Sequence, residues 1–380
     1  MTKNKYLKVN KELLNGSKLL TLNLPNFVYL PLVKNGEKLT LLKSIEDEVK
    51  EGEIIAQNDT KTYSLLSTIS GKIKSVEEEC LPSGEFVLAV KIENNFKSVE
   101  PLKKLVKPSD SAIKTRILEG NITQLFGVEN GTEILIDGME TKTTLGLNNF
   151  LIKNHLNQIL KGTNLLKKAF NLEHIKLMVN KDEKQLINEG IEKLNLKGLE
   201  LVNHAKKFKD TVLSLETVLN LYNAVEHGDM ANEKFVAVAG LSAKNPSYYL
   251  VKIGTSMEEL IELTGGLRHT YEEIENYRDN ALMALHDEVE LKKEIKLEEN
   301  EDEREKLLDL LKEKKHEARE HIFDKLEEHR EKYALCLSNI VVIVDDKIYP
   351  INQIKNSVAS GVNSVLFLSN REHPKHSKKR

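Results

Sequence analysis

The sequence IEDEVKEGEIIAQ at residues 45–57 and the sequence STISGKI at residues 67–73 each combine a glycine with a short apolar run. Around them, residues 27–94 divide into short strand-like segments separated by Asn-Gly, Glu-Gly, Ser-Gly and Pro-Ser-Gly turns. Closely spaced strands and turns of this kind are typical of all-β modules. We therefore predict an all-β domain over residues 1–98, followed by a charged linker at residues 99–111.

The composition indicates a soluble protein with several domains. The 380 residues are 40% hydrophobic and 30% charged, which is enough apolar material for more than one core. The formal net charge of -3 gives no reason to expect a nucleic acid or an anionic membrane as a partner. The apolar runs fall far short of the roughly 20 residues that span a bilayer, and the N-terminus lacks the pattern of a signal peptide. We expect a cytoplasmic protein without a transmembrane helix.

The two cysteines, Cys80 and Cys336, are too few for an iron–sulfur cluster or a structural zinc site, which need about four converging ligands. We expect both to be small buried or half-buried thiols. The sequence HEAREH at residues 316–321 is similar to a metalloprotease motif, but its outer histidines lie about 140° apart around a helix. We predict neither a metal site nor a set of catalytic residues.

Residues 112–230 change to an alternation of strands and helices. The segments ILIDGM at 134–139, IKLMVN at 175–180 and ELVNH at 200–204 are strand-like. Residues 148–170 and 214–228 carry the apolar spacing of helices. This alternation predicts a parallel sheet with crossover helices, that is, a Rossmann-like α/β domain.

Residues 234–370 predict a β-grasp unit. FVAVAGL at 235–241 and YLVKIG at 249–254 form a predicted strand pair, and Ser256 begins a helix as its N-cap, with Glu259 in the capping-box position. Strands resume within residues 339–351 and 362–370, before a basic tail at residues 371–380.

A helical hairpin is predicted to interrupt this unit at residues 270–333. The segment is highly charged from Glu298 onward and contains no glycine or proline there, as in a coiled coil. We predict an antiparallel helical pair whose outer face is polar. Two apolar stripes would join its helices: Leu307, Leu311, Ala318, Ile322 and Leu326 on one, and Ala281, Leu282, Leu285, Val289 and Ile295 on the other.

Several segments, in the same order, resemble the RnfC family, which is the peripheral subunit of the Rnf electron-transport complex. VYLPLVKNGEKLTLLKSIEDEVKEGEIIA, followed by LLSTISGKI, is similar to the family's N-terminal barrel-sandwich hybrid. ILIDGMETKTTLGLNN and FVAVAGLSAKNPSYYLVKIGTSMEELIELTGGL resemble later family segments, so the likeness covers most of residues 27–268 and, more loosely, 338–369. PrdC-like electron-transfer proteins, associated with proline reductase, belong to the same superfamily. The resemblance implies a barrel-sandwich hybrid at 1–98, an FMN/NADH-binding-like domain at 112–230 and an SLBB-like β-grasp unit at 234–370.

The family's cofactor motifs are altered in this sequence. The family holds FMN with a Gly-rich loop before the ILIDG strand, where this chain has RILEGNITQLFGVENGTE with scattered glycines. Of the family's binding residues, Gly138, Glu140 and Thr217 match, and Asp137 replaces an Asn. The family usually continues into a ferredoxin-like domain, whereas this sequence ends at Arg380. The resemblance therefore implies no iron–sulfur cluster and an eroded flavin site, with Asp137, Gly138, Glu140 and Thr217 as the candidate cofactor-binding residues.

Three functions remain open. The first is an RnfC-like accessory or scaffold subunit that binds protein partners in a membrane-associated or soluble redox complex, in the cytoplasm or at the inner face of the cell membrane. The second is an electron-transfer protein that still binds FMN or NAD near Glu140. The third is a swinging-arm carrier, because Lys61 lies near the hairpin position where lipoyl and biotin carriers are modified.

Overall fold

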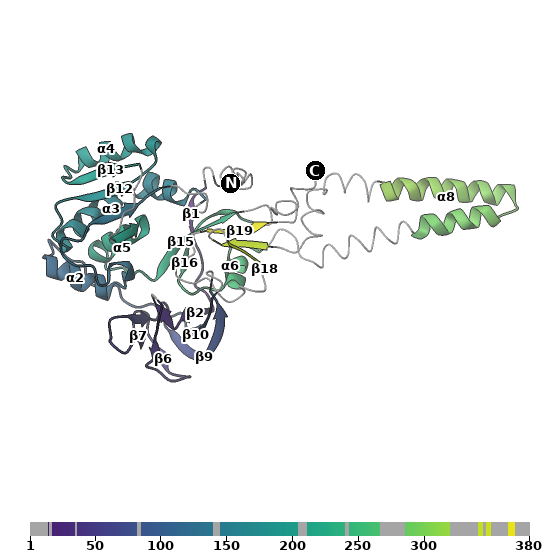
Figure 1. Cartoon of the computed structure of the whole chain (residues 1–380). Coiled ribbons are helices and arrows are strands. Elements are labelled where there is room, and N and C mark those ends of the chain that lie inside the picture. The colour runs from purple at the N-terminus through teal and green to yellow at the C-terminus, as the bar shows by residue number, and fades with distance from the viewer. Residues whose placement is uncertain are drawn as a thin grey trace. The chain divides into compact units, whose positions relative to one another are not determined.

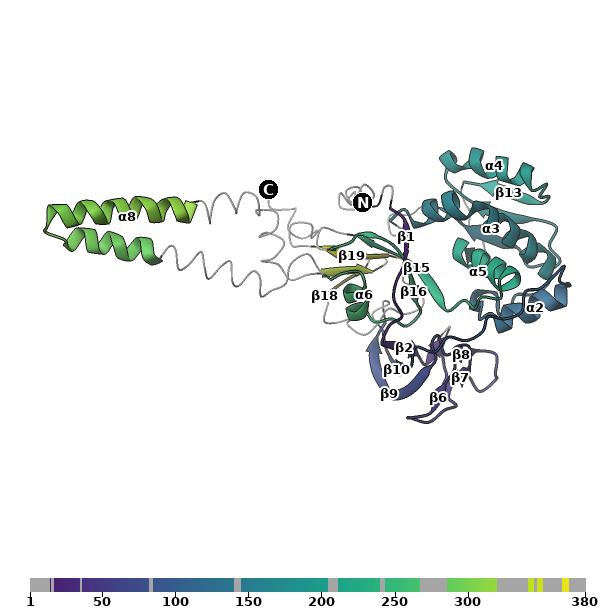
Figure 2. The same cartoon turned by 180° about the vertical axis from the view of Figure 1, so that it is seen from behind.

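The computed structural model describes residues 14, 17–34, 36–81, 85–139, 145–203, 211–239, 243–266, 286–319, 341–344, 347–350 and 364–368 (Figures 1 and 2). The chain divides into two compact units. The first consists of Met1–Gly240, Asn245–Gly265 and Val342–Leu366, and the second of Leu241–Lys244, Gly266–Val341 and Phe367–Arg380.

The N-terminal part of the first unit is all-β, as the turn spacing predicts. One four-stranded sheet has the order β2-β10-β9-β6, and it is accompanied by a three-stranded sheet, β5-β7-β8, and a two-stranded ribbon, β3-β4. The core consists of aliphatic side chains from these strands and their turns, among them Val28, Ile55, Ile73 and Ile92. The strands are β2 (Phe27–Pro31), β3 (Val33–Lys34), β4 (Glu37–Lys38), β5 (Thr40–Leu41), β6 (Glu48–Val49), β7 (Ile54–Gln57), β8 (Ser64–Leu66), β9 (Gly71–Cys80) and β10 (Phe86–Asn94).

The two glycines of the opening motifs, Gly52 and Gly71, are required for different structural reasons. Gly52 adopts a φ of +81° in the turn before β7, a conformation that residues with a Cβ rarely adopt. Gly71 begins β9, and a Cβ there would lie 2.0 Å from the carbonyl oxygen of Glu93 on β10. The first glycine makes the turn, and the second allows two backbones to approach closely.

The second part is a parallel sheet with helices, as the alternation of elements predicts. Its strand order is β13-β12-β11-β14, and all neighbouring strands are parallel. The long helix α3 packs against α5 at a point where a Cβ on Gly162 would lie 2.3 Å from the carbonyl oxygen of Val218. The elements are α2 (Asp110–Glu119), η1 (Thr123–Leu125), β11 (Ile134–Asp137), α3 (Leu147–Ala169), β12 (Ile175–Met178), η2 (Lys181–Glu183), α4 (Lys184–Lys193), β13 (Leu199–Val202), β14 (Thr211–Ser214) and α5 (Leu215–Glu226).

The third part is a six-stranded sheet with the order β1-β16-β15-β19-β17-β18. β15 and β16 pair antiparallel, as predicted, and β19 joins β15 in parallel although more than 120 residues separate them in the sequence. The late strands thus belong to the same sheet as the early pair. The elements are β1 (Leu19–Thr21), β15 (Glu233–Ala239), β16 (Ser247–Lys252), α6 (Met257–Leu263), β17 (Val341–Val344), β18 (Lys347–Pro350) and β19 (Ser364–Leu368).

Strand β1 belongs to a different sheet from the other strands of residues 1–98. It lies within the segment that we assign to the all-β domain, yet it pairs in parallel with β16, with Leu20 opposite Tyr249. The Ser247 hydroxyl donates a hydrogen bond to the carbonyl oxygen of Lys18 at 2.9 Å and helps to set this register. A strand of only three residues carries little local signal of the sheet that it joins.

Glu259 has a different partner from the one its capping-box position predicts. Ser256 does cap α6, accepting from the Glu259 backbone N–H at 3.1 Å. The Glu259 carboxylate, however, accepts from the backbone N–H groups of Asn26 and Phe27, at the start of β2. Together with a 2.7 Å bond from the Tyr29 N–H to the Gly254 carbonyl, this contact fixes the all-β part to the six-stranded sheet. Two unpaired amides at a strand entrance are stronger partners for a buried carboxylate than the helix's own N-cap.

The second unit contains two helical segments, residues 286–297 and α8 (Glu301–Arg319), which lie side by side in both views (Figures 1 and 2). Ile295 and Leu311 are both 8% exposed, and Lys315 contributes to lowering the pKa of Glu288, after the larger effect of the hydrogen bond from Lys292. Glu288 lies near the start of the first segment and Lys315 near the end of α8, so the interaction between them indicates that the two segments run antiparallel.

The predicted apolar stripes are correct only in part. Val289 is 51% exposed, so it does not face the partner helix; Leu291 is half-buried in its place. Leu307 is half-buried, as predicted. The other stripe residues, Ala281, Leu282, Leu285, Ala318, Ile322 and Leu326, lie outside the residues whose side chains the structure describes.

Candidate functional site

The candidate site lies at the carboxyl edge of the parallel sheet. β11 comes first in sequence at the centre, with β12 and β13 on one side and β14 on the other, so the strand order reverses between β11 and β14. Their last residues, Asp137 and Ser214, are direct neighbours in register. In open α/β sheets, ligands bind outside the carboxyl ends of the strands at such a reversal.

Asp137 and Gly138, two of the candidate residues, serve the turn that follows β11. The Asp137 carboxylate accepts from the backbone N–H of Met139 at 3.0 Å, which is the local turn bond that aspartate commonly forms. The Gly138 N–H donates to the Met178 carbonyl at 2.8 Å. A Cβ on Gly138 would lie 3.0 Å from that same oxygen, so the residue closely fits the end of β12. Glu140 lies outside the described residues.

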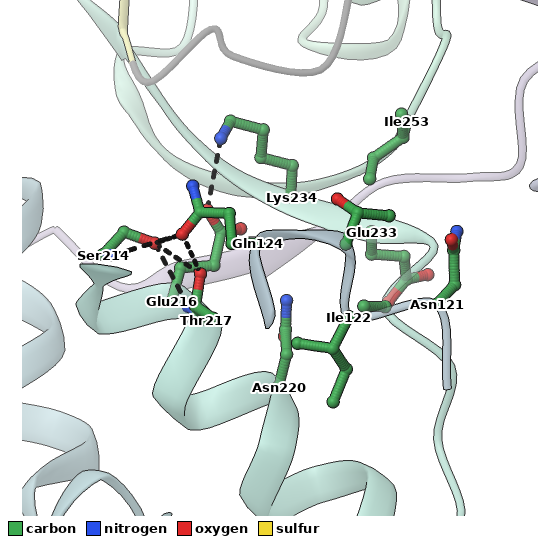
Figure 3. A pocket seen from close by; sticks show the side chains of 12 residues that line it. Asn121, Ile122, Gln124, Ser214, Glu216, Thr217, Asn220, Glu233, Lys234 and Ile253 are labelled. Carbon is green, nitrogen blue, oxygen red and sulfur yellow. Dashed lines mark hydrogen bonds and ion pairs between the residues drawn. The ribbon is translucent and has the colours of Figure 1, made fainter. Parts of the chain in front are cut away.

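Thr217 belongs to the first turn of α5 and lies beside a residue that the sequence reasoning missed. Ser214 caps the helix by accepting from the Thr217 N–H at 3.1 Å. The side-chain oxygen of Gln124 then accepts three hydrogen bonds at this helix end (Figure 3). The donors are the Ser214 N–H at 3.3 Å, the Ser214 hydroxyl at 3.4 Å and the Thr217 hydroxyl.

This arrangement occupies the positive end of α5 with an uncharged amide oxygen. A free helix N-terminus binds anions because its first N–H groups lack partners and its dipole favours negative charge. Gln124 comes from η1, within the segment RILEGNITQLFGVENGTE, and a lone glutamine in such a segment gives no signal of this role. The glycines of the segment serve other purposes: Gly120 ends α2, and Gly127 and Gly131 form turns with φ near +76° and +77°.

A cleft of about 220 Å³ opens beside Gln124, between the N-terminal end of helix α5 and the start of strand β15 (Figure 3). Lys234 forms an ion pair with Glu216 at 3.3 Å, and Glu216 also accepts from the Phe235 N–H at 2.8 Å. Glu233, the residue before Lys234, is 3.5 Å from Lys252 and 38% exposed. The lining residues are Asn121, Ile122, Thr123, Gln124, Ser214, Glu216, Thr217, Asn220, Ala231, Glu233, Lys234 and Ile253.

One wall of the cleft continues into a polar network that joins all three parts of the first unit. Lys252 on β16 pairs with Glu51 of the all-β part at 2.7 Å, a shorter contact than the one to Glu233. Asn232, which is 1% exposed, donates to Glu51 at 3.2 Å and accepts from Asn121 at 3.4 Å. The cleft wall is therefore held in place from two sides.

Other residues singled out by the sequence lie elsewhere. Lys61 is exposed in the turn between β7 and β8, with a φ of +57°. Cys80 is buried, and burial raises the pKa of its thiol. Within the described residues, no group of His, Cys, Asp and Glu side chains is arranged to hold a metal ion, and no helix has the length and apolar character needed to cross a membrane.

The all-β part has a counterpart among known families. Residues 5–97 match the family model of the RnfC barrel sandwich hybrid domain. The N-terminal domain is therefore RnfC-like. This confirms the resemblance inferred from the tandem glycine motifs, and the RnfC-like domain contains both Gly52 and Gly71.

Among solved structures, two of an NAD+-reducing NiFe-hydrogenase are similar to parts of this chain. The air-oxidized form is 11% identical with a TM-score of 0.33, covering 42% of this chain and 39% of the hydrogenase chain. The H2-reduced form is 11% identical with a TM-score of 0.30, covering 42% and 36%. This chain thus spans well under half the length of those proteins. No curated protein matches the sequence.

Proposed function

We propose that this RnfC-like chain is an accessory or scaffold subunit of an electron-transfer or reductase system, with an eroded flavin site and no iron–sulfur cluster of its own. The RnfC-like domain supports a place among electron-transfer subunits. In this proposal the protein works in the cytoplasm, free or at the inner face of the cell membrane, and contributes binding surfaces to protein partners.

The observation that carries the proposal is the position of Gln124. The phosphate of FMN would need free N–H and hydroxyl donors at the start of α5, and Gln124 already accepts from Ser214 and Thr217 there. The residues present at this helix end therefore do not fit the phosphate. A cleft of about 220 Å³ is also below the roughly 300–1,000 Å³ of typical sites for drug-sized ligands. This sequence contains only two cysteines, which supports the absence of an iron–sulfur cluster.

Flavin titration of the full chain tests the proposal, because bound FMN loses much of its fluorescence in most protein sites. We expect no saturable quenching by the unmodified protein at micromolar concentrations. The matched variant Gln124→Ala removes the oxygen that fills the helix end, so weak binding of FMN or inorganic phosphate by this variant alone would support the role of Gln124. Saturable, stoichiometric binding of FMN by the unmodified chain would overturn the proposal.

A flavin- or nicotinamide-binding electron carrier is the second candidate, and its support is the location of the cleft at the reversal of strand order. The same titration, repeated with NADH, decides between the two functions.

The swinging-arm carrier function rests only on the exposed turn at Lys61. An intact mass equal to that of the bare sequence in protein isolated from its native cells would eliminate it.

A further inference from the structure

The cleft beside Gln124 retains polar groups that its own hydrogen bonds do not use. The Gln124 oxygen is fully engaged, but its side-chain N–H2 has no partner within the described part of the chain. Asn220, in the second turn of α5, likewise makes no side-chain hydrogen bond among the described residues. One amide donor and one complete amide thus remain available to a ligand.

The lining also carries one cation, Lys234, and two carboxylates, Glu216 and Glu233, whose ionic contacts are long. Lys234 is 3.3 Å from Glu216, and Glu233 is 3.5 Å from Lys252. Both distances exceed the 2.7–2.9 Å of a strong charge-assisted hydrogen bond. Lys252 is shared with Glu51 at 2.7 Å, and Glu216 is shared with the Phe235 N–H at 2.8 Å. Lys234 and Glu233 are therefore incompletely satisfied, and each has capacity for a further partner.

Neighbouring residues of a strand normally point to opposite faces, yet Glu233 and Lys234 both line the cleft because they lie at the very start of β15. A ligand between them meets opposite charges at its two ends. The volume of about 220 Å³ suits a ligand of a few heavy atoms and is below the roughly 300–1,000 Å³ of typical sites for drug-sized ligands.

We propose that this cleft binds a small zwitterion of the amino-acid class, with its carboxylate at Lys234 and Gln124 and its ammonium group at Glu233. The inference rests on the proposed function, because a helix end filled by Gln124 leaves no phosphate site. In the proposed scaffold, such a ligand would contact both the segment beside the N-terminal end of α5 and the start of β15.

Titration calorimetry of the full chain at low salt tests this binding with a series of probes. Glycine, β-alanine and 4-aminobutyrate carry both charges at increasing separation, whereas butyrate and butylamine each keep one end of 4-aminobutyrate. We expect at least one zwitterion to bind about tenfold or more tightly than either single-charge probe, since hydrogen bonds to charged groups are the strong ones. The probe that binds best reports the separation of the two charges.

Two variants assign the ends of the ligand. Glu233→Gln should weaken the best zwitterion about tenfold and leave butyrate unchanged, whereas Lys234→Met should weaken the zwitterion and leave butylamine unchanged. Glu200→Gln and Lys153→Met, at exposed positions on β13 and α3, are matched controls that should change nothing. Circular dichroism of each variant establishes that it is folded.

The proposal is overturned if no zwitterion binds at about 10 mM, a concentration at which even millimolar affinity is detected. Binding that neither variant weakens would also overturn it. FMN binding by the unmodified chain would instead contradict the proposed function, so the two failures are distinguishable.

Discussion

Replacing Gly71 by alanine should destabilise the RnfC-like domain strongly. The new Cβ would lie 2.0 Å from the Glu93 carbonyl oxygen, 2.9 Å from its carbonyl carbon and 3.1 Å from Cγ2 of Ile92. The nearest atoms are backbone, so β9 and β10 must separate rather than a side chain turn aside. Overpacking of well-packed sites costs about 1–3 kcal/mol, and a clash with backbone belongs at or above the upper end. We expect a loss of about 3 kcal/mol in the free energy of unfolding.

Denaturant unfolding followed by circular dichroism measures this loss. Gly36→Ala is a matched control in the same domain, because Gly36 has a φ of +80° with no atom within 4 Å of an added Cβ. It isolates the cost of a left-handed conformation, roughly 1–2 kcal/mol, without a clash. Gly71 has no positive φ, so its cost is steric alone. The reasoning is refuted if Gly71→Ala costs less than Gly36→Ala.

Three further predictions concern other positions, two of them buried and one, Lys34, half-buried. Gly162→Ala should cost about 2 kcal/mol or more in unfolding free energy, because its Cβ would lie 2.3 Å from the Val218 carbonyl oxygen between α3 and α5; unchanged stability would contradict this. Burial lowers the pKa of Lys34 to about 8, so the folded state binds fewer protons than the unfolded state between about pH 8 and the ordinary lysine value of 10.5. Stability should therefore rise with pH across that window, and Lys34→Met should remove this slope in pH-dependent unfolding. Cys80 is buried with a raised thiol pKa, so alkylation at mildly alkaline pH should be much slower in the folded protein than in denaturant; equal rates would contradict its burial.

Much of the architecture follows from local patterns. The turn residues and short apolar runs around Gly52 and Gly71 predict the all-β domain, because both glycines are required by the backbone itself. The alternation of apolar strands with amphipathic helices predicts the parallel sheet, and Ser214 and Ser256 mark helix starts through their own hydroxyl groups. Each of these signals depends on a few consecutive residues, so it can be recognised in the sequence without knowledge of the fold.

The features that depend on distant partners were not predictable. β1 joins β16 across more than 220 residues, and Glu259 binds the start of β2 instead of its own helix. Gln124 meets Ser214 and Thr217 only because the strand order brings β11 and β14 together. Of the candidate site residues, Thr217 lines the cleft, whereas Asp137 and Gly138 serve a turn. The order of the strands in the sheet brings the site residues together, and the spacing of residues in the sequence does not predict that order.

The most direct test of the proposed function is the flavin content of the 380-residue chain, purified without added cofactor. The visible absorption spectrum is recorded, and any flavin is then released by acid precipitation and quantified by its fluorescence against the protein concentration. The proposal that Gln124 blocks the end of α5 predicts a colourless protein with far less than one flavin per chain. A yellow protein that carries one flavin per chain would contradict it.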